Sequence, residues 1–98
     1  MENIAIVTVA YNRVKSLSRL LNSLLCADID NAPLIISIDK SNTNEVERYA
    51  NDFIWPYGEK KVITHKENLG LRKHILSIGQ LLDYYDAVIV LEDDIIVA

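Results

Sequence analysis

Short apolar runs alternate along the chain with longer segments whose apolar residues recur every three or four positions. The runs at 4–10, 34–38 and 87–91 are rich in β-branched residues and have almost no polar position. Such runs are typical of strands buried on both faces of a parallel sheet. A fourth run, 61–65, has fewer apolar residues but is also rich in β-branched ones. The pattern therefore predicts four strands.

The segments between these runs predict three amphipathic helices, because their apolar residues fall on one helical face. The second covers 46–53 and the third 75–85. Asn12 is the expected N-cap of the first helix, and Asn42 with Glu45 has the spacing of a capping box before the second. The apolar face of the first helix is formed by Val14, Leu17, Leu20, Leu21, Leu24 and Leu25.

Strands that alternate with helices indicate a parallel sheet covered by helices. Right-handed crossovers allow the first three strands to wind outward, and the fourth then returns beside the first, which gives the order 3-2-1-4. Ligands of such sheets bind outside the carboxyl ends at the switch point, here between the first and fourth strands. The residues expected near that edge are 11–13, Asp39 and 92–94.

The composition limits the class of protein. The chain has 98 residues, of which 50% are hydrophobic, so we expect one folded domain and exclude intrinsic disorder. A net charge of −4 argues against a dedicated nucleic-acid binder. The single cysteine, Cys26, excludes an internal disulfide. No run approaches the ~20 apolar residues of a membrane span, so we expect a soluble, cytoplasmic protein without a transmembrane segment.

The acidic triplet Glu92, Asp93 and Asp94 directly follows the last apolar run. Three adjacent carboxylates repel one another, and a divalent cation relieves that repulsion. Hard oxygen ligands suit Mg²⁺ or Mn²⁺, which would leave coordination sites for a diphosphate. The alternative is a solvated acidic turn without a metal.

Two further residues are candidates for ligand contact. Asp39, at the end of the second strand, could accept hydrogen bonds from a base or a ribose; alternatively it caps the turn at 41–43. Arg13, after the first strand, could hold a phosphate or lie on the surface. Cys26 and Trp55 are expected in the core, and the two histidines do not form a metal pair.

In their order along the chain, four segments together resemble the N-terminal half of a GT-A nucleotide-diphospho-sugar glycosyltransferase: IAIVTVAYNR, IISIDKSNTNE, KENLG and AVIVLEDDIIVA. The acidic triplet resembles the N-acetylglucosaminyltransferase I group, whereas the motifs YNR, D-x-S and NLG resemble the family-two enzymes. The resemblance implies a three-layer α/β fold, the Rossmann-like half of a GT-A domain.

The resemblance also implies roles for individual residues. Arg13 would approach the nucleotide, and Asp39 would contact the uracil or the ribose of a UDP-sugar. Glu92 and Asp93 would lie near the ribose and the sugar, and Asp94 would bind Mn²⁺ or Mg²⁺ at the diphosphate. Residues 40–43 depart from the family pattern, in which glycine and serine follow the acid of the second strand.

Under this interpretation residues 1–98 are the nucleotide-sugar-binding half of a longer enzyme, and the acceptor-binding half and catalytic base lie beyond residue 98. The alternative is a non-catalytic nucleotide-binding or self-assembling module. A phosphoacceptor receiver is disfavoured, because Tyr11 and Asn12 occupy the positions where it needs acids. We also expect self-association through the edge of the fourth strand or the apolar tail 95–98.

Overall fold

The structure, a computed structural model, describes residues 4–27, 29, 31–67, 79 and 83–92. The boundaries predicted for the first two strands are confirmed, the third strand lies one residue earlier, and the fourth extends to Glu92. The third helix predicted over 75–85 lies largely outside the described residues. The elements are β1 (Ile4–Ala10), α1 (Val14–Leu25), β2 (Leu34–Ile38), α2 (Glu45–Asp52), β3 (Lys60–Thr64) and β4 (Ala87–Glu92).

The four strands form one sheet in the order β3-β2-β1-β4, and every neighbouring pair is parallel. This confirms the predicted α/β fold and strand order. Because all strands run the same way, their carboxyl ends meet at one edge of the sheet. β1 and β2 lie in the middle, and every residue of β2 is buried. The residues that follow β1 and β2 are therefore positioned by the well-packed central strands of the sheet.

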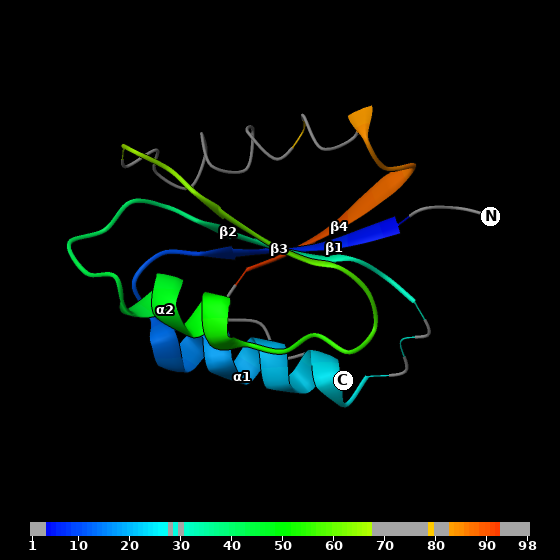
Figure 1. Ribbon diagram of the computed structural model, residues 1–98, viewed down its shortest axis with the longest axis horizontal. Helices are drawn as coiled ribbons and strands as arrows, with labels where there is room; N and C mark the ends of the chain where they lie inside the picture. Colours follow the sequence, from blue (N-terminus) through cyan, green and yellow to red (C-terminus); the bar gives the residue numbers. More distant parts are fainter. Residues whose placement is uncertain (1–3, 28, 30, 68–78, 80–82, 93–98) are drawn as a thin grey trace.

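Both described helices lie on the same face of the sheet (Figure 1). Even-numbered residues of β1 and β2 point toward these helices, and odd-numbered residues point to the opposite face, as the period of a strand requires. The opposite face carries a second apolar cluster of Ala5, Val7, Val9 and Ile35. The main core on the helical face contains Ile6, Ala10, Leu17, Leu20, Leu21, Leu24, Leu34, Ile36, Ile38, Val46 and Ala50.

Both predicted helix caps are wrong. Arg13, not Asn12, precedes α1, and it makes no side-chain capping bond. α2 begins at Glu45 after Asn44, so Asn42 is too far away to form the expected capping box. Instead the Thr43 hydroxyl accepts a hydrogen bond from the Glu45 backbone N–H at 3.3 Å.

Lys60 connects the end of α2 to the start of β3. Its ammonium group donates to three carbonyl oxygens, those of Ala50, Asn51 and Phe53, at 2.7, 2.8 and 2.6 Å. A cation at a helix C-terminus satisfies carbonyls that have no partner within the helix. This contact fixes the C-terminal end of α2 relative to the amino end of β3.

β4 is an edge strand, as predicted, since among the described residues it pairs only with β1. It is less buried than its apolar sequence suggests: the side chains of Ile89 and Val90 are 50% and 38% exposed. Cys26 is also exposed, so the expectation that it packs in the core is wrong. Trp55 is buried, as predicted.

Thr8 provides a test of the packing on the helical face. Its side chain is fully buried in the middle of β1, beside Ile36 of β2 and Leu91 of β4, and its hydroxyl oxygen has no hydrogen-bond partner among the described residues. Burying an unpaired hydroxyl is unfavourable, so we expect Thr8→Val to raise the free energy of unfolding by about 1 kcal/mol. Urea denaturation followed by circular dichroism measures this change.

The matched control for that measurement is Thr64→Val, at an exposed position of β3. It should leave the denaturation midpoint nearly unchanged. A loss of stability in Thr8→Val would contradict the prediction, and would mean that the hydroxyl has a partner in the folded chain.

Candidate functional site

Polar residues follow all four strands at the carboxyl edge of the sheet. Residues 11–13 come after β1, Asp39 after β2 and His65 after β3, while Glu92 is the last residue of β4. The fold thus brings together residues that are far apart in the sequence. Among the predicted site residues, Arg13, Asp39 and Glu92 are described at this edge, and Asp93 and Asp94 lie outside the described residues.

Asp39 is the most buried acidic side chain among the described residues, with 5% of its surface exposed. Its backbone N–H donates to the Ala10 carbonyl at 2.9 Å, which continues the β1–β2 pairing beyond the strands. One carboxylate oxygen accepts a hydrogen bond from the Lys40 backbone N–H at 2.8 Å. The backbone therefore holds this carboxylate at a fixed position on the sheet edge.

The turn after Asp39 is closed by other side chains. The Ser41 hydroxyl donates to the Thr43 carbonyl at 3.0 Å and accepts from the Thr43 backbone N–H at 3.4 Å. These two hydrogen bonds close the turn locally, directly beyond the Asp39 carboxylate.

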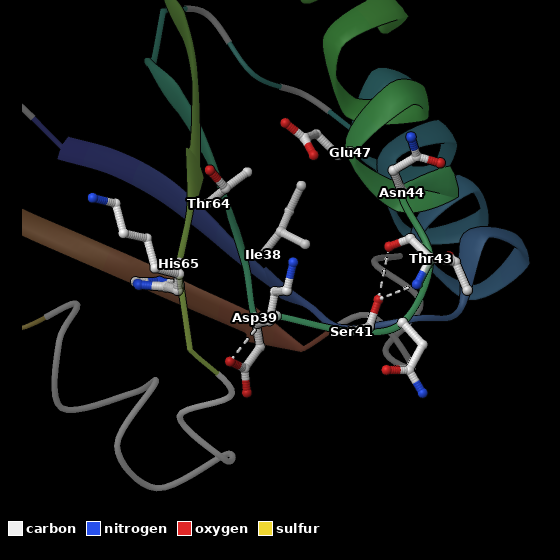
Figure 2. Close-up of a pocket in the computed structure, with 11 residues that line it drawn as sticks. Ile38, Asp39, Ser41, Thr43, Asn44, Glu47, Thr64 and His65 are labelled. Carbon is white, nitrogen blue, oxygen red and sulfur yellow. Dashed lines mark hydrogen bonds between the residues drawn. The ribbon is translucent and has the colours of Figure 1, made fainter.

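A hollow of about 560 Å³ opens beside Asp39, between the carboxyl ends of β2 and β3 and the start of α2. A volume of this size is in the range of small-molecule sites. Figure 2 shows side chains from all three elements around it, with the Ser41–Thr43 turn on one side and His65 on the other. The lining residues are Ile38, Asp39, Lys40, Ser41, Asn42, Thr43, Asn44, Glu47, Thr64, His65 and Lys66.

This position differs from the sequence-based prediction, which placed the ligand between the first and fourth strands. The hollow lies beyond the ends of β2 and β3, and that pair of strands is two strand positions from the β1–β4 pair. The sequence also gave no role to His65, which lines the hollow and whose Nε2 lies 3.3 Å from the Ser37 hydroxyl.

Glu92 lies on the same face of the sheet as Ser37. Val9 of β1 pairs with Ser37 on one side and with Glu92 on the other, so these three side chains share a face. Two strand spacings, about 9–10 Å, separate β4 from β2. A single elongated ligand that crosses the end of β1 could therefore contact both Asp39 and Glu92.

Arg13 lies where β1 meets α1, and its side chain is exposed. Its backbone carbonyl accepts the first hydrogen bond of the helix, from the Leu17 N–H at 3.0 Å. As for metals, the described residues contain no group of three or more His, Cys, Asp or Glu side chains arranged to hold an ion.

Comparison with known proteins identifies the family. The family model described as glycosyl transferase family 2 matches residues 5–97, which is nearly the whole chain. The chain belongs to glycosyl transferase family 2. This confirms the family-two resemblance of the sequence motifs. Neither helix in the described part of this family 2 chain is long and apolar enough to cross a membrane.

Solved structures support the same fold. A crystal structure of S. aureus TarS residues 1–349 aligns with a TM-score of 0.64 and 22% identity, covering 94% of this chain and 27% of that one. A longer TarS structure gives the same score and identity, with 16% of that chain covered. A third is TarS 1–349 in complex with UDP, again at 0.64, 22% and 94%, with 27% of that chain covered. No curated protein matches the chain in sequence.

The family 2 chain thus spans about a quarter or less of the length of the TarS structures that it matches. At this identity the likeness shows the fold alone. The site must therefore be interpreted from the residues of this chain.

Proposed function

We propose that this chain is the donor-binding part of a metal-dependent glycosyltransferase that uses a nucleotide-sugar, most simply a UDP-sugar. The observation that carries the proposal is the buried Asp39 carboxylate, held by the backbone at the edge of a polar hollow in a family 2 fold. The TarS complex with UDP supports the choice of a uridine nucleotide.

In this proposal the nucleotide lies across the carboxyl ends of β2, β1 and β4. Asp39 accepts hydrogen bonds from the base or the ribose, since a carboxylate is a pure acceptor. The guanidinium of Arg13 approaches the nucleotide from the β1–α1 junction. Glu92 and Asp93 lie toward the ribose and the sugar at the end of β4.

The residues after β4 have the donor chemistry for Mg²⁺ or Mn²⁺. Glu92 brings a half-buried carboxylate to the sheet edge, and two further carboxylates follow in the sequence, of which we assign Asp94 as the metal ligand. Hard divalent cations take carboxylate oxygens in this way. When bound, the ion would neutralise the diphosphate and so stabilise it as a leaving group.

Acceptor activation is assigned to another part of the enzyme. Transfer with inversion needs a base that deprotonates the acceptor hydroxyl. We propose that residues 1–98 form the nucleotide-sugar-binding half, and that this base and the acceptor site lie beyond residue 98. The short span of the TarS structures covered by this chain supports this division.

A second candidate function is a non-catalytic nucleotide-binding module that self-associates. It is favoured by the exposed side chains of Ile89 and Val90 on edge strand β4. Exposed apolar edges promote pairing with another chain. A concentration series in light scattering distinguishes it: a dimer or larger assembly supports this function, and a monomer at high concentration contradicts it.

The proposal is tested by calorimetric titration of the chain with UDP, GDP and UDP-GlcNAc, with and without Mn²⁺. We expect UDP and UDP-GlcNAc to bind, and affinity to fall at least tenfold when Mn²⁺ is removed, because the diphosphate then loses its counter-charge. Asp94→Ala should cause the same loss in the presence of Mn²⁺.

The control variant is Asp83→Ala, which removes an exposed carboxylate before β4 and should bind as the parent does. Absence of binding to every nucleotide would overturn the proposed function. Equal affinity with and without Mn²⁺ would overturn its metal-dependent part alone.

A further inference from the structure

In the proposed complex the nucleotide crosses the carboxyl ends of β2, β1 and β4, and no part of it is assigned to the hollow beside β3. That hollow lies on the helical face of the sheet. Ile38, which packs in the main core, pairs with Thr64 of β3, and the facing wall is the start of α2. Figure 2 shows Thr64 and Asn44 on either side of Ile38. A ligand in the hollow would therefore lie between the end of β3 and the first turn of α2.

The charges around the hollow balance one another. Its lining has two carboxylates, Asp39 and Glu47, and two ammonium groups, Lys40 and Lys66. A phosphate or a divalent cation is bound by an excess of the opposite charge, which this mixture does not supply. The lining therefore favours a ligand without net charge.

The uncharged part of the lining is mostly polar. Ile38 is the only apolar residue among the described residues that line the hollow. Asn42 and Asn44 contribute amides, which both donate and accept hydrogen bonds, and Thr64 contributes a hydroxyl. All three are exposed, and Asn44 directly precedes α2 without capping it through its side chain. This mixture of donors and acceptors suits a ligand that is covered with hydroxyl groups.

We propose that the hollow is a saccharide-binding subsite that is separate from the nucleotide site. A sugar hydroxyl is both a donor and an acceptor, so the amides and the Glu47 carboxylate can pair with it. A saccharide also agrees with the membership of the chain in a family of glycosyl transferases.

The sugar of the donor does not reach this subsite. For the position of the donor the inference rests on the proposed function, in which that sugar lies at the end of β4. Three strand spacings, about 14 Å, separate β4 from β3. The occupant is therefore a sugar residue of a second molecule, the acceptor or product glycan, at a point remote from the reacting hydroxyl.

The experiment follows the amide NMR spectrum of the whole chain during titration with chitotriose and with maltotriose. We expect at least one of these oligosaccharides to shift the side-chain amide signals of Asn42 and Asn44, with a dissociation constant of about 1 mM, the strength of a few exposed hydrogen bonds. The amide of Asn22, exposed on α1, should not shift. The shifts should persist when UDP and Mn²⁺, or UDP-GlcNAc and Mn²⁺, are present at saturating concentration.

Glu47→Ala and Glu45→Ala are a matched pair of variants. Both residues are exposed acids in the first turn of α2, but only Glu47 lines the hollow. Glu47→Ala should weaken oligosaccharide binding about tenfold, because a charge-assisted hydrogen bond is lost, and should leave UDP affinity unchanged. Glu47→Gln should recover part of the loss, whereas Glu45→Ala should bind both ligands as the parent does. Thermal denaturation shows whether each variant is folded.

The outcomes separate this inference from the proposed function. Displacement of the oligosaccharide by UDP would assign the hollow to the nucleotide, and displacement by UDP-GlcNAc but not by UDP would assign it to the sugar of the donor; either result would overturn the inference alone. So would the absence of shifts with both oligosaccharides, or equal losses in Glu47→Ala and Glu45→Ala. Oligosaccharide binding by a chain that binds no nucleotide would overturn the proposed function and leave the saccharide subsite in place.

Discussion

Asp39→Asn is expected to lower the affinity of the chain for UDP by about 100-fold while leaving the fold intact. The asparagine oxygen can still accept the hydrogen bond from the Lys40 N–H, so the turn is preserved. In the proposed complex the other carboxylate oxygen accepts a hydrogen bond from the nucleotide, and the substitution replaces it with an NH₂ group that cannot accept one. The expected loss of about 2–3 kcal/mol is that of a charge-assisted hydrogen bond to a buried group.

Calorimetry with UDP measures the effect, and Asp52→Asn serves as the control. Asp52 is an exposed carboxylate at the end of α2 and undergoes the same loss of charge. The control should bind UDP with the affinity of the parent, which separates a specific contact from a general change in net charge. A dissociation constant for Asp39→Asn within twofold of the parent value would show that this carboxylate is not part of the nucleotide site.

The strands were predictable because a strand that is buried on both faces has an uninterrupted run of apolar residues. Residues 4–10 and 34–38 are uninterrupted apolar runs, and both became central strands with the predicted boundaries. The order 3-2-1-4 followed from the alternation of strands and helices together with the handedness of crossovers. For β4 the apolar run led us to expect more burial than the structure has, because the exposure of side chains on an edge strand depends on which segments pack against that strand.

The helix starts were less predictable, since several neighbouring residues can satisfy the same backbone groups. Residues 41–45 include four polar side chains with capping ability, and the sequence does not decide among them. In the structure it is the hydroxyls of Ser41 and Thr43 that form hydrogen bonds within this turn. A choice between such contacts depends on the direction in which the chain leaves β2.

The candidate site was predictable in part. Asp39 could be placed at the sheet edge because it directly follows a buried strand. The pairing of Ser37 with His65 could not, because the two residues are 28 positions apart and only the β2–β3 register brings them together. The available signal was a serine inside an apolar run and a histidine at the end of the neighbouring one, a polar pair whose burial requires a partner.

Trp55→Ala is expected to cause the largest loss of stability, about 3–5 kcal/mol, as for other buried aromatic residues. The indole is 6% exposed, and its N–H donates to the Ala32 carbonyl at 2.7 Å. It also meets the Tyr57 ring edge to face, with centroids 5.0 Å apart, and the Tyr57 hydroxyl donates to the Leu25 carbonyl. The substitution removes the ring that connects the end of α1, the turn before β2 and the approach to β3.

The close packing around this ring limits how far the chain can relax after the substitution. Gly58 lies against the same turn: a Cβ there would be 2.7 Å from the Ala32 carbonyl oxygen, so the two segments are already in contact. A cavity left by Trp55→Ala therefore cannot close by moving these segments together, which places the expected loss in the upper part of the range for such substitutions.

Guanidinium denaturation followed by circular dichroism measures the loss, with two reference variants. Trp55→Phe keeps an aromatic ring but removes the N–H, so it should lose about 1–2 kcal/mol. Ile54→Ala, at a neighbouring side chain that is 80% exposed, should leave the midpoint nearly unchanged. A change below 1 kcal/mol in Trp55→Ala would contradict the prediction.

Trp55 lies at the amino ends of the strands, opposite Asp39. We therefore expect Trp55→Ala to bind UDP with the affinity of the parent when binding is measured well below the unfolding midpoint. Equal affinity would show that the substitution changes the stability of the sheet and not the binding chemistry at its carboxyl edge.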